Sequence, residues 1–473
     1  MKKNTILIFI FFIHYGFAQK IDQIKYEGSS ISIENLLQNY LRILSVSGNE
    51  KEAGDFMKNI CKENGLFISD FGKENGTYNF AASVLPLSSK KPNIIFLNHL
   101  DVVPEMEGSD EDSTRGSIDD GIIYGRGAID NKGAAMMQLY SIIQILNHED
   151  LQNSKYNITF LSVSCEETQC DGGVKYVINH YFDQLNPAVV IGEGPTELTT
   201  LIGGEFKYPI FGISVAHKRN FWLNLELSSN NISHGSITPL NYSNKELVVS
   251  LNKLTKKKNK AIFNDLNTGL LKALAEHKKG IEKMILKHPK LFKPILIPQL
   301  RKQPELFSLF SNTITLTNIY TNSVAYNEIA SKTVAFLDCR LLPDTDEKVF
   351  LEQVRKRLDN DSIKITVVSQ MPPTKPSSVN SIFFKNLSTS ILDKFPNSIT
   401  LPLLMPNVND LGAFRSKNIP AYASIPVYLT KEQVESIHGE NEHISVKALY
   451  TGAEVYYNFL LKMESEQTIN SSH

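Results

Sequence analysis

The chain has 473 residues, more than one ordinary hydrophobic core accommodates, and at about 150 residues per domain this length predicts two or three domains. Charged residues make up 21% of the sequence and nearly cancel, which leaves a formal net charge of −1. Such a balance gives no sign of a polyanionic partner, so the composition argues against a nucleic-acid-binding protein.

The N-terminal residues predict export. Residues 1–4 include two lysines, residues 5–13 form a short apolar run, and the small residues Gly16 and Ala18 follow. This pattern is typical of a secretory signal peptide over residues 1–18, cleaved before Gln19. The apolar run is shorter than the roughly 20 residues of a membrane-spanning helix, and no later segment reaches that length. We therefore expect a periplasmic or extracellular protein without a stable membrane span, the alternative being an uncleaved anchor.

The first part of the chain alternates helices and strands. Apolar residues at helical spacing predict two opening helices over residues 31–44 and 52–61. Apolar runs bounded by turn residues predict strands at four places, namely 79–84, 93–98, 158–161 and 187–191. A glycine-containing turn leads into a helix with Asp130 at or near its N-cap, and a further helix is expected over 173–181. Alternation of this kind predicts an α/β layered sheet with crossover connections.

Beyond residue 203 the pattern changes. Strands are expected at 221–227, 313–320, 333–341 and 363–368, with lysine-rich helices from 245 to 302 and a helix over 347–358. This β-α-β-β-α-β order predicts a separate α+β domain of the ferredoxin-like kind. We assign residues 19–211 and 371–473 to the main α/β domain. The α+β domain then covers residues 212–370, with a helical insertion at about 245–311.

The four cysteines are too few for a disulfide framework in a chain of this length. Export would permit a bridge between Cys165 and Cys170, but their spacing is equally compatible with buried free thiols.

Four residues that can bind metal stand at predicted strand ends and helix starts. His99, Glu167 and Glu193 follow predicted strands directly or nearly so, and Asp130 opens a helix. In a parallel sheet these positions share one edge, so the side chains should converge there. Taken singly, each has an ordinary alternative: a buried histidine, a solvated strand terminus, a loop acid or a helix cap.

Three carboxylates crowded beside an imidazole are costly unless a cation neutralises them, so we predict one or two divalent ions at this edge. Imidazole and carboxylate ligands suit zinc, and also cobalt or manganese. Asp101 lies two residues after His99, where it could accept the second imidazole N–H and fix the tautomer, or serve only as a turn residue.

Five segments in this order resemble the successive motifs of the aminoacylase/carboxypeptidase family of metallopeptidases, which includes carboxypeptidase G, succinyl-diaminopimelate desuccinylase and carboxypeptidase S. The segments are His99–Pro104, Gly125–Gly133, Glu166–Glu167, Gly192–Gly194 and His438–Glu442. The resemblance extends from about residue 31 to about residue 462. The insertion between Lys245 and Asn312 looks most similar to carboxypeptidase S and to related hydrolases of N-fatty-acyl amino acids.

The resemblance implies a zinc exopeptidase-like catalytic domain that holds two Zn²⁺ ions per subunit. It assigns five ligands: Asp130 bridging both ions, His99 and Glu193 on one, and Glu167 and His438 on the other. Glu166 would be the general base on the bridging water. His443 lies in the same loop as His438, but the family pattern fits His438 and leaves His443 as a polar loop residue.

The resemblance also makes the α+β domain a lid and a dimerisation domain. His234 matches a histidine that helps to hold the oxyanion, in several relatives from the partner subunit; without the family it would be taken for a surface turn residue. Arg340 matches the arginine that binds the substrate carboxylate, a task that suits its planar pair of donors, and Asn327 would assist. Two features depart from the pattern, because Cys165 stands where relatives commonly carry Asp, and the proline often found after Asn327 is missing.

The implied function is zinc-dependent hydrolysis of an amide bond next to a free carboxylate, by an exopeptidase of the carboxypeptidase type or by an aminoacylase. The substrate would be a small peptide or an N-acyl amino acid, and the motifs do not separate these two. One alternative is a catalytically silent peptide-binding protein on the same fold. Another is a di-metal hydrolase of a different bond such as a phosphoester, against which the lack of a phosphate-binding glycine loop counts.

Overall fold

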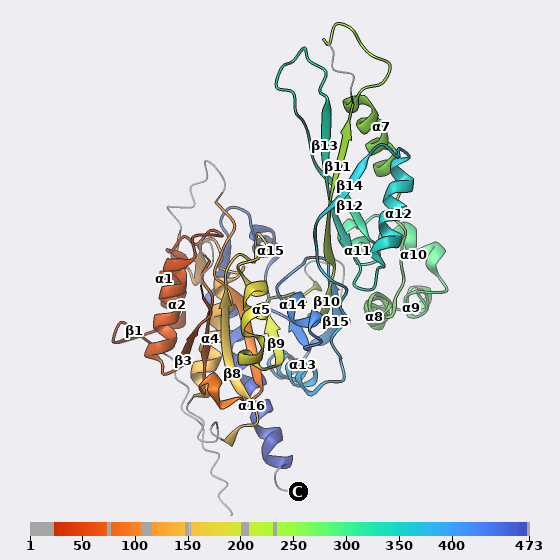
Figure 1. The fold of residues 1–473 in the computed structure, drawn as a ribbon. Helices are drawn as coiled ribbons and strands as arrows, with labels where there is room; N and C mark the ends of the chain where they lie inside the picture. The colour runs from red at the N-terminus through yellow and green to blue at the C-terminus, as the bar shows by residue number, and fades with distance from the viewer. Residues whose placement is uncertain are drawn as a thin grey trace, which may run out of the picture.

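The structure is a computed structural model that describes the backbone of residues 23–72, 77–105, 115–146, 151, 153–199, 208–229 and 234–470 (Figure 1). The predicted signal peptide, residues 1–18, lies outside the described residues. Within these ranges, no helix combines the length and the apolar character that crossing a membrane requires.

The large sheet has eight strands in the order β15-β10-β16-β9-β5-β8-β4-β3. Their bounds are β3 (Phe67–Asp70), β4 (Phe80–Ser83), β5 (Asn93–His99), β8 (Asn157–Val163), β9 (Pro187–Gly192), β10 (Ile210–His217), β15 (Ile399–Met405) and β16 (Ala421–Ala423). Strand β5 pairs in parallel with β8 and with β9, whereas β3, β4 and β8 pair antiparallel to one another in turn. The sheet is therefore mixed, and the carboxyl ends of β5, β8 and β9 meet at one edge.

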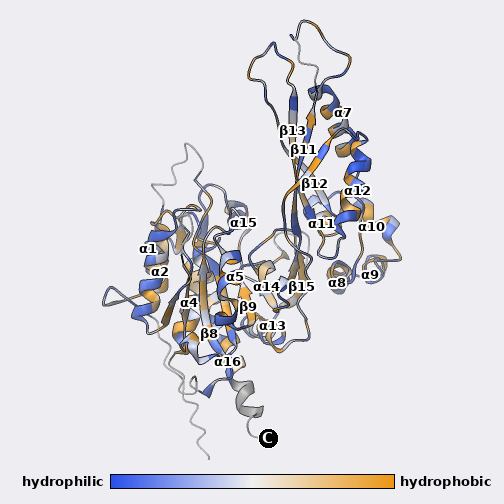
Figure 2. Cartoon of the chain, in the orientation of Figure 1, coloured by the Kyte–Doolittle hydropathy of each residue, from blue (hydrophilic) through white to orange (hydrophobic). Residues whose placement is uncertain are grey.

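Helices cover both faces of this sheet, which confirms the predicted α/β fold class (Figure 1). On one face lie α1 (Ile33–Leu41), α2 (Lys51–Glu63), α4 (Lys132–Ile145), α13 (Ile382–Lys394) and α16 (Val446–Asn470). On the other face lie α5 (Val174–Leu185) and α14 (Leu411–Ser416). Alternate residues of β5 point to the two cores, Phe96 to the first and Leu97 to the second. Figure 2 shows hydrophobic strands in the middle and hydrophilic outer faces on helices such as α1 and α2.

A second sheet has four strands in the order β12-β13-β11-β14, and all neighbouring strands are antiparallel. It consists of β11 (Arg219–Ser228), β12 (Thr313–Thr321), β13 (Lys332–Leu341) and β14 (Lys364–Gln370), and α7 (Ser243–Lys256) and α12 (Glu347–Leu358) share its hydrophobic core. The predicted β-α-β-β-α-β order is present, because α7 follows β11 and α12 precedes β14.

The chain enters this sheet later than we predicted. Residues 210–217 form β10 of the large sheet, whereas our predicted boundary placed residue 212 onward in the α+β domain. Strand β10 is buried at every position, as expected for a strand between helical layers. The four-stranded sheet therefore starts only at β11, after His217.

The predicted insertion at about 245–311 also divides differently. Its first helix is α7, which packs on the four-stranded sheet. The remainder consists of α8 (Asp265–Leu274), α9 (Gly280–Lys287), α10 (Lys293–Leu300) and α11 (Pro304–Ser308). Leu270 and Leu274 of α8 pack with Leu401 and Leu403 of β15. Helix α8 thus lies against the large sheet, and α8 and α9 are below the four-stranded sheet (Figure 1).

Arg219, the first residue of β11, stabilises the crossing between the two sheets, where the chain passes from β10 to β11. Its side chain is fully buried, and its guanidinium donates to Glu347 Oε1 at 2.5 Å, to the carbonyl of Met371 at 2.8 Å and to that of Thr345 at 2.7 Å. The residue at the entrance to the four-stranded sheet is thereby tied to the segment that leaves it.

Candidate metal centre

The side chains predicted to bind metal lie at the edge where the parallel strands end. His99 is the last residue of β5, Glu193 follows β9 directly, and Glu166 and Glu167 follow β8. Asp130 precedes Asn131, which caps α4. A small sheet of β6 (Ile118–Asp119), β7 (Ile122–Tyr124) and β17 (His443–Ser445) brings the loop of His438 to the same place.

Asp130 lies between two histidines and offers one carboxylate oxygen to each. His99 Nε2 is 3.2 Å from Asp130 Oδ1 and 3.0 Å from Glu193 Oε2. His438 Nε2 is 3.2 Å from Asp130 Oδ2 and 3.2 Å from Glu167 Oε1. The five predicted ligands therefore form two groups that share Asp130.

The donor atoms fit divalent ions. His99, Asp130 and Glu167 each supply an atom within 4.8 Å of the others, and so do His99, Glu166 and Glu193, so the carboxylate of the predicted base Glu166 also lies beside the predicted ligands. Ligand atoms around one tetrahedral zinc ion lie about 3.3 Å apart, close to the spacings of 3.0 and 3.2 Å seen here. Nitrogen and oxygen donors suit zinc, cobalt and manganese alike.

The electrostatics of the cluster also call for cations. Burial, and then the negative charge of Glu193, raise the pKa of Glu166 well above its usual range. Burial opposes ionisation of Asp130, but hydrogen bonds from His438 and His99 outweigh it and lower the pKa of Asp130. In return, Asp130 and Glu167 raise the pKa of His438 to about 10. Protonated imidazoles thus balance the carboxylates, which is the task that metal ions would perform.

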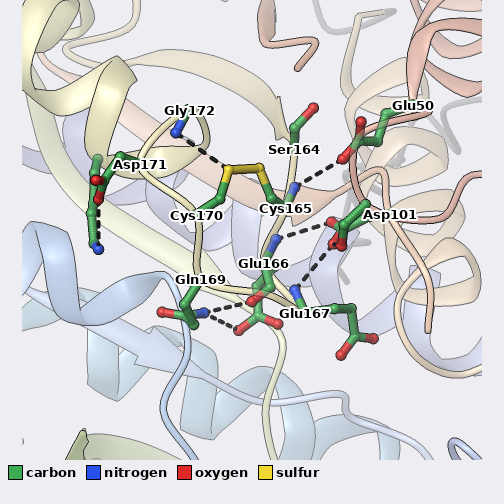
Figure 3. The surroundings of a disulfide bond; sticks show 12 residues. Glu50, Asp101, Ser164, Cys165, Glu166, Glu167, Gln169, Cys170, Asp171 and Gly172 are labelled. Carbon is green, nitrogen blue, oxygen red and sulfur yellow. Dashed lines mark hydrogen bonds and ion pairs between the residues drawn. A yellow bond between two sulfur atoms is a disulfide. The ribbon is translucent and has the colours of Figure 1, made fainter. Parts of the chain in front are cut away.

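Asp101 supports the cluster differently from our prediction. His99 Nδ1 donates a hydrogen bond to the backbone carbonyl of Asp101 at 2.9 Å, whereas the nearer oxygen of the Asp101 carboxylate is 3.4 Å from Nδ1. The carboxylate of Asp101 instead accepts the backbone N–H groups of Glu166 at 3.0 Å and Glu167 at 3.1 Å (Figure 3). It also accepts the hydroxyl of Ser47 at 2.7 Å. Asp101 therefore fixes the backbone that carries the two adjacent glutamates.

A disulfide joins Cys165 to Cys170 and closes the loop that carries Glu166 and Glu167 (Figure 3). Of the two alternatives for this pair, the structure thus shows the bridge, while Cys61 and Cys339 are buried free thiols. Gln169, inside the loop, donates to Glu166 Oε1 at 3.1 Å.

The cluster opens into a cavity of about 500 Å³ between the two sheets. Glu166, Glu167 and His438 line one side, and Trp222 and Arg340 of the four-stranded sheet line another. The cavity is thus large enough for a small organic substrate and has metal-binding groups in its wall.

Comparison with known proteins identifies the family. The chain matches peptidase family M20/M25/M40 over residues 95–462. It belongs to this family. Human N-fatty-acyl-amino acid synthase/hydrolase PM20D1 is 26% identical over 380 residues, which are 79% of this chain and 74% of the relative. Probable carboxypeptidase S-like 2 of Dictyostelium discoideum is 26% identical over 385 residues, or 80% and 72% of the two chains.

Solved structures agree in fold with this M20 protein. The M20 family metallo-carboxypeptidase Sso-CP2 from Sulfolobus solfataricus superposes with a TM-score of 0.65 at 20% identity, over 91% of this chain and 98% of that one. Human carnosine dipeptidase 1 gives a TM-score of 0.62 at 15% identity, over 92% and 96%. The predicted family resemblance is confirmed, and the chain is a metallohydrolase of the M20 family with a candidate metal-binding site.

Arg340 lines the cavity of the M20 protein, and it already has a partner. Its Nε and Nη2 donate to the carboxylate of Asp338 at 2.8 and 3.1 Å, and Trp222 Nε1 donates to the same carboxylate at 3.0 Å. Since an arginine has five N–H donors, this ion pair leaves donors for a substrate carboxylate.

His234 and Asn327 lie apart from the metal-binding cluster. Both are exposed, and Asn327 Nδ2 lies 2.9 Å from His234 Nε2. The loops that carry them are at the end of the four-stranded sheet farthest from the large sheet (Figure 1). Neither residue lines the cavity within this chain. His443 also stays outside the cluster, since its ring stacks on Tyr124 with the centroids 5.2 Å apart.

Glu442 supports the site, and we did not predict this role. It is buried, and its carboxylate accepts the backbone N–H groups of Gly127 at 3.0 Å, Ile129 at 2.8 Å and Asp130 at 3.0 Å. These bonds hold the loop that presents Asp130. The available signal was the position of Glu442 at the end of the His438 motif, an acidic residue for which we had named no partner.

Asn131 is a second residue that we did not predict. Its Nδ2 donates to Glu193 Oε2 at 2.7 Å. It thus orients the carboxylate that faces His99.

We predict that Glu442→Gln weakens metal binding about ten- to a hundredfold, because the amide cannot accept all three backbone N–H groups and Asp130 loses its support. Competition with a chromogenic chelator measures this affinity. Glu440→Gln, an exposed residue of the same loop, is the matched control and should bind metal as the wild type does. Equal affinities for both variants would contradict the role of Glu442.

We predict that the paired change of Cys165 and Cys170 to Ser lowers the free energy of unfolding by about 2 kcal/mol, since a short loop is no longer closed. The value of kcat/KM should fall about ten- to a hundredfold, because Glu166 is less firmly positioned. A phosphine reductant should lower the activity of the wild type and leave that of the double variant unchanged. A wild type that is fully active when reduced would refute this positioning role.

Proposed function

We propose that this M20 protein is a two-metal hydrolase of amide bonds next to a free carboxylate, either an exopeptidase of the carboxypeptidase type or an aminoacylase. The observation that carries the proposal is Asp130, whose two oxygens face separate groups formed by a histidine and a carboxylate, each at 3.2 Å from the imidazole nitrogen. A bridging carboxylate between two such groups is the arrangement that a metal pair requires.

His99 and Glu193 would hold one ion, Glu167 and His438 the other, and Asp130 both; zinc is the proposed metal, with cobalt or manganese as substitutes. When bound, the ions would polarise the scissile carbonyl and acidify water between them. Glu166 faces the same cavity and would take the proton of the attacking water and deliver it to the leaving amine. Burial raises the pKa of Glu166, and a carboxylate with a higher pKa is a stronger base.

Arg340 would bind the substrate carboxylate, and the names of the relatives support substrates of this type, since they include an N-fatty-acyl-amino acid synthase/hydrolase and a probable carboxypeptidase. A catalytically silent peptide-binding protein would be expected to lack the base or a ligand. Glu166 and His438 are both in place, so we favour the enzyme.

His234 and Asn327 lie far from the cavity of their own chain, and we propose that they act in the cavity of a partner subunit. A homodimer formed through the four-stranded domain would then place His234 where it donates to the oxyanion. In this arrangement the active site is complete only in the dimer.

We predict that the metal-loaded protein hydrolyses members of a panel of dipeptides and N-acyl amino acids, and that Glu166→Gln lowers kcat at least a hundredfold without loss of metal. The matched variant Glu167→Gln should lose metal as well as activity. Activity is followed by amine release and metal content by elemental analysis, with zinc, cobalt and manganese each restored after chelation. A wild type that binds no metal and hydrolyses none of the panel would refute the proposal, and an active Glu166→Gln would remove the assigned base.

We predict that co-expressed His234→Ala and Glu166→Gln chains, each inactive alone, recover up to about a quarter of the wild-type activity, because half of the dimers would be mixed and one of their two sites complete. Activity per purified dimer is the measurement. No recovery from mixed dimers would show that His234 does not act across the subunits.

A further inference from the structure

A second cavity lies next to the metal-binding one and has a different character. Its volume is about 370 Å³, and its wall is formed mainly by leucines, namely Leu198, Leu270, Leu306, Leu309, Leu403 and Leu404. Among its described lining residues, the side chains of Gln303 and Glu305 alone are polar, and both are exposed. An apolar cavity of this size favours an apolar occupant.

The two cavities adjoin. Met405 and Pro406 line both of them. The segment after β9 also contributes to both cavities. Its residue Gly194 lines the metal-binding cavity, and the next residue, Pro195, lines the apolar one. An extended group that starts at the metal-binding cluster therefore passes these residues to enter the second cavity.

The helical insertion builds the outer wall of the apolar cavity. Leu270 belongs to α8, Leu306 to α11, and Leu309 directly follows α11, while Leu403 and Leu404 belong to β15 of the large sheet. Leu270 and Leu403 are nearly fully buried and belong to one apolar cluster, so this wall is held by packing on the sheet. Helices α8 and α11 and strand β15 carry none of the metal-binding groups, whereas Pro195 of the same cavity lies two residues after Glu193.

We propose that the apolar cavity binds the acyl group of an N-acyl amino acid substrate, and that this acyl group is a long aliphatic one. This inference rests on the proposed amide hydrolysis. With the amide at the cluster and the carboxylate at Arg340, the acyl chain runs past Met405 and Pro406 into the leucine-lined space.

An aliphatic chain fits this cavity better than an extended peptide does. A peptide carries an N–H and a C=O at each residue, and burying them without partners is costly. The leucine side chains offer no such partners, whereas an aliphatic chain needs none. The cavity therefore favours fatty acyl substrates over longer peptides.

The test compares kcat/KM for N-acetyl-, N-octanoyl- and N-dodecanoyl-leucine at concentrations below micelle formation. Each buried methylene should raise kcat/KM by about two- to fourfold until the cavity is filled. Leu306→Trp and Leu270→Trp fill the cavity and should lower the ratio of dodecanoyl to acetyl kcat/KM at least tenfold. Ile295→Trp makes the same kind of change on the exposed face of α10 and should leave the ratio as in the wild type.

A wild type without chain-length preference, or pocket variants that keep the wild-type ratio, would overturn the inference. Binding of N-dodecanoyl-leucine to Glu166→Gln, measured by calorimetry with and without the added Leu306→Trp change, tests the cavity independently of turnover. If no substrate is hydrolysed but Leu306→Trp weakens this binding at least tenfold, the proposed reaction fails and the acyl site stands. Binding that is unaffected by Leu306→Trp overturns the acyl site.

Discussion

The structure around the metal-binding cavity depends on how several carboxylates are kept close together at one edge of the eight-stranded sheet. Glu166 and Glu193 both have raised pKa values, because burial and neighbouring negative charge disfavour their ionised forms. Imidazoles balance part of this charge, and divalent ions would balance it more completely. The neighbouring acids Asp101 and Glu442 contribute in another way, since both use their oxygens to fix backbone N–H groups and thereby hold the loops that carry the ligands.

The ligand positions could be predicted from the sequence because they follow from local patterns. Buried strands are continuous apolar runs, and in a parallel sheet the residues after them share one edge, so His99, Glu167 and Glu193 could be placed together without coordinates. The supporting contacts could not be predicted in this way. Glu442 lies 312 to 315 residues from the N–H groups that it accepts, and the pairing of β17 with β7 brings the two segments together.

Competition between hydrogen-bond donors explains why the carboxylate of Asp101 does not accept the imidazole N–H of His99 as we predicted. A carboxylate two residues after a metal-binding histidine is well placed to accept its second N–H. The backbone N–H groups of Glu166 and Glu167 compete for those oxygens, and the carbonyl of Asp101 takes the imidazole instead. Cys165, which departs from the family pattern, belongs to the same loop and is held covalently to Cys170. Such a bridge is stable in an oxidising compartment.

The arrangement separates the chemistry from the choice of substrate. Parallel strands of the large sheet lead to three of the five predicted ligands, His99, Glu167 and Glu193, and the burial of these strands on both faces leaves little freedom for change. The apolar cavity depends instead on α8 and α11, which come from an insertion between α7 and β12. Lys218, at the crossing between the sheets, donates to the carbonyl of Ser308 at 3.2 Å and to the hydroxyl of Thr313 at 3.1 Å, and so ties the end of α11 to that crossing. Substitution of the leucines of the insertion can therefore change which acyl group the cavity accepts. The groups that would bind the metals stay in place.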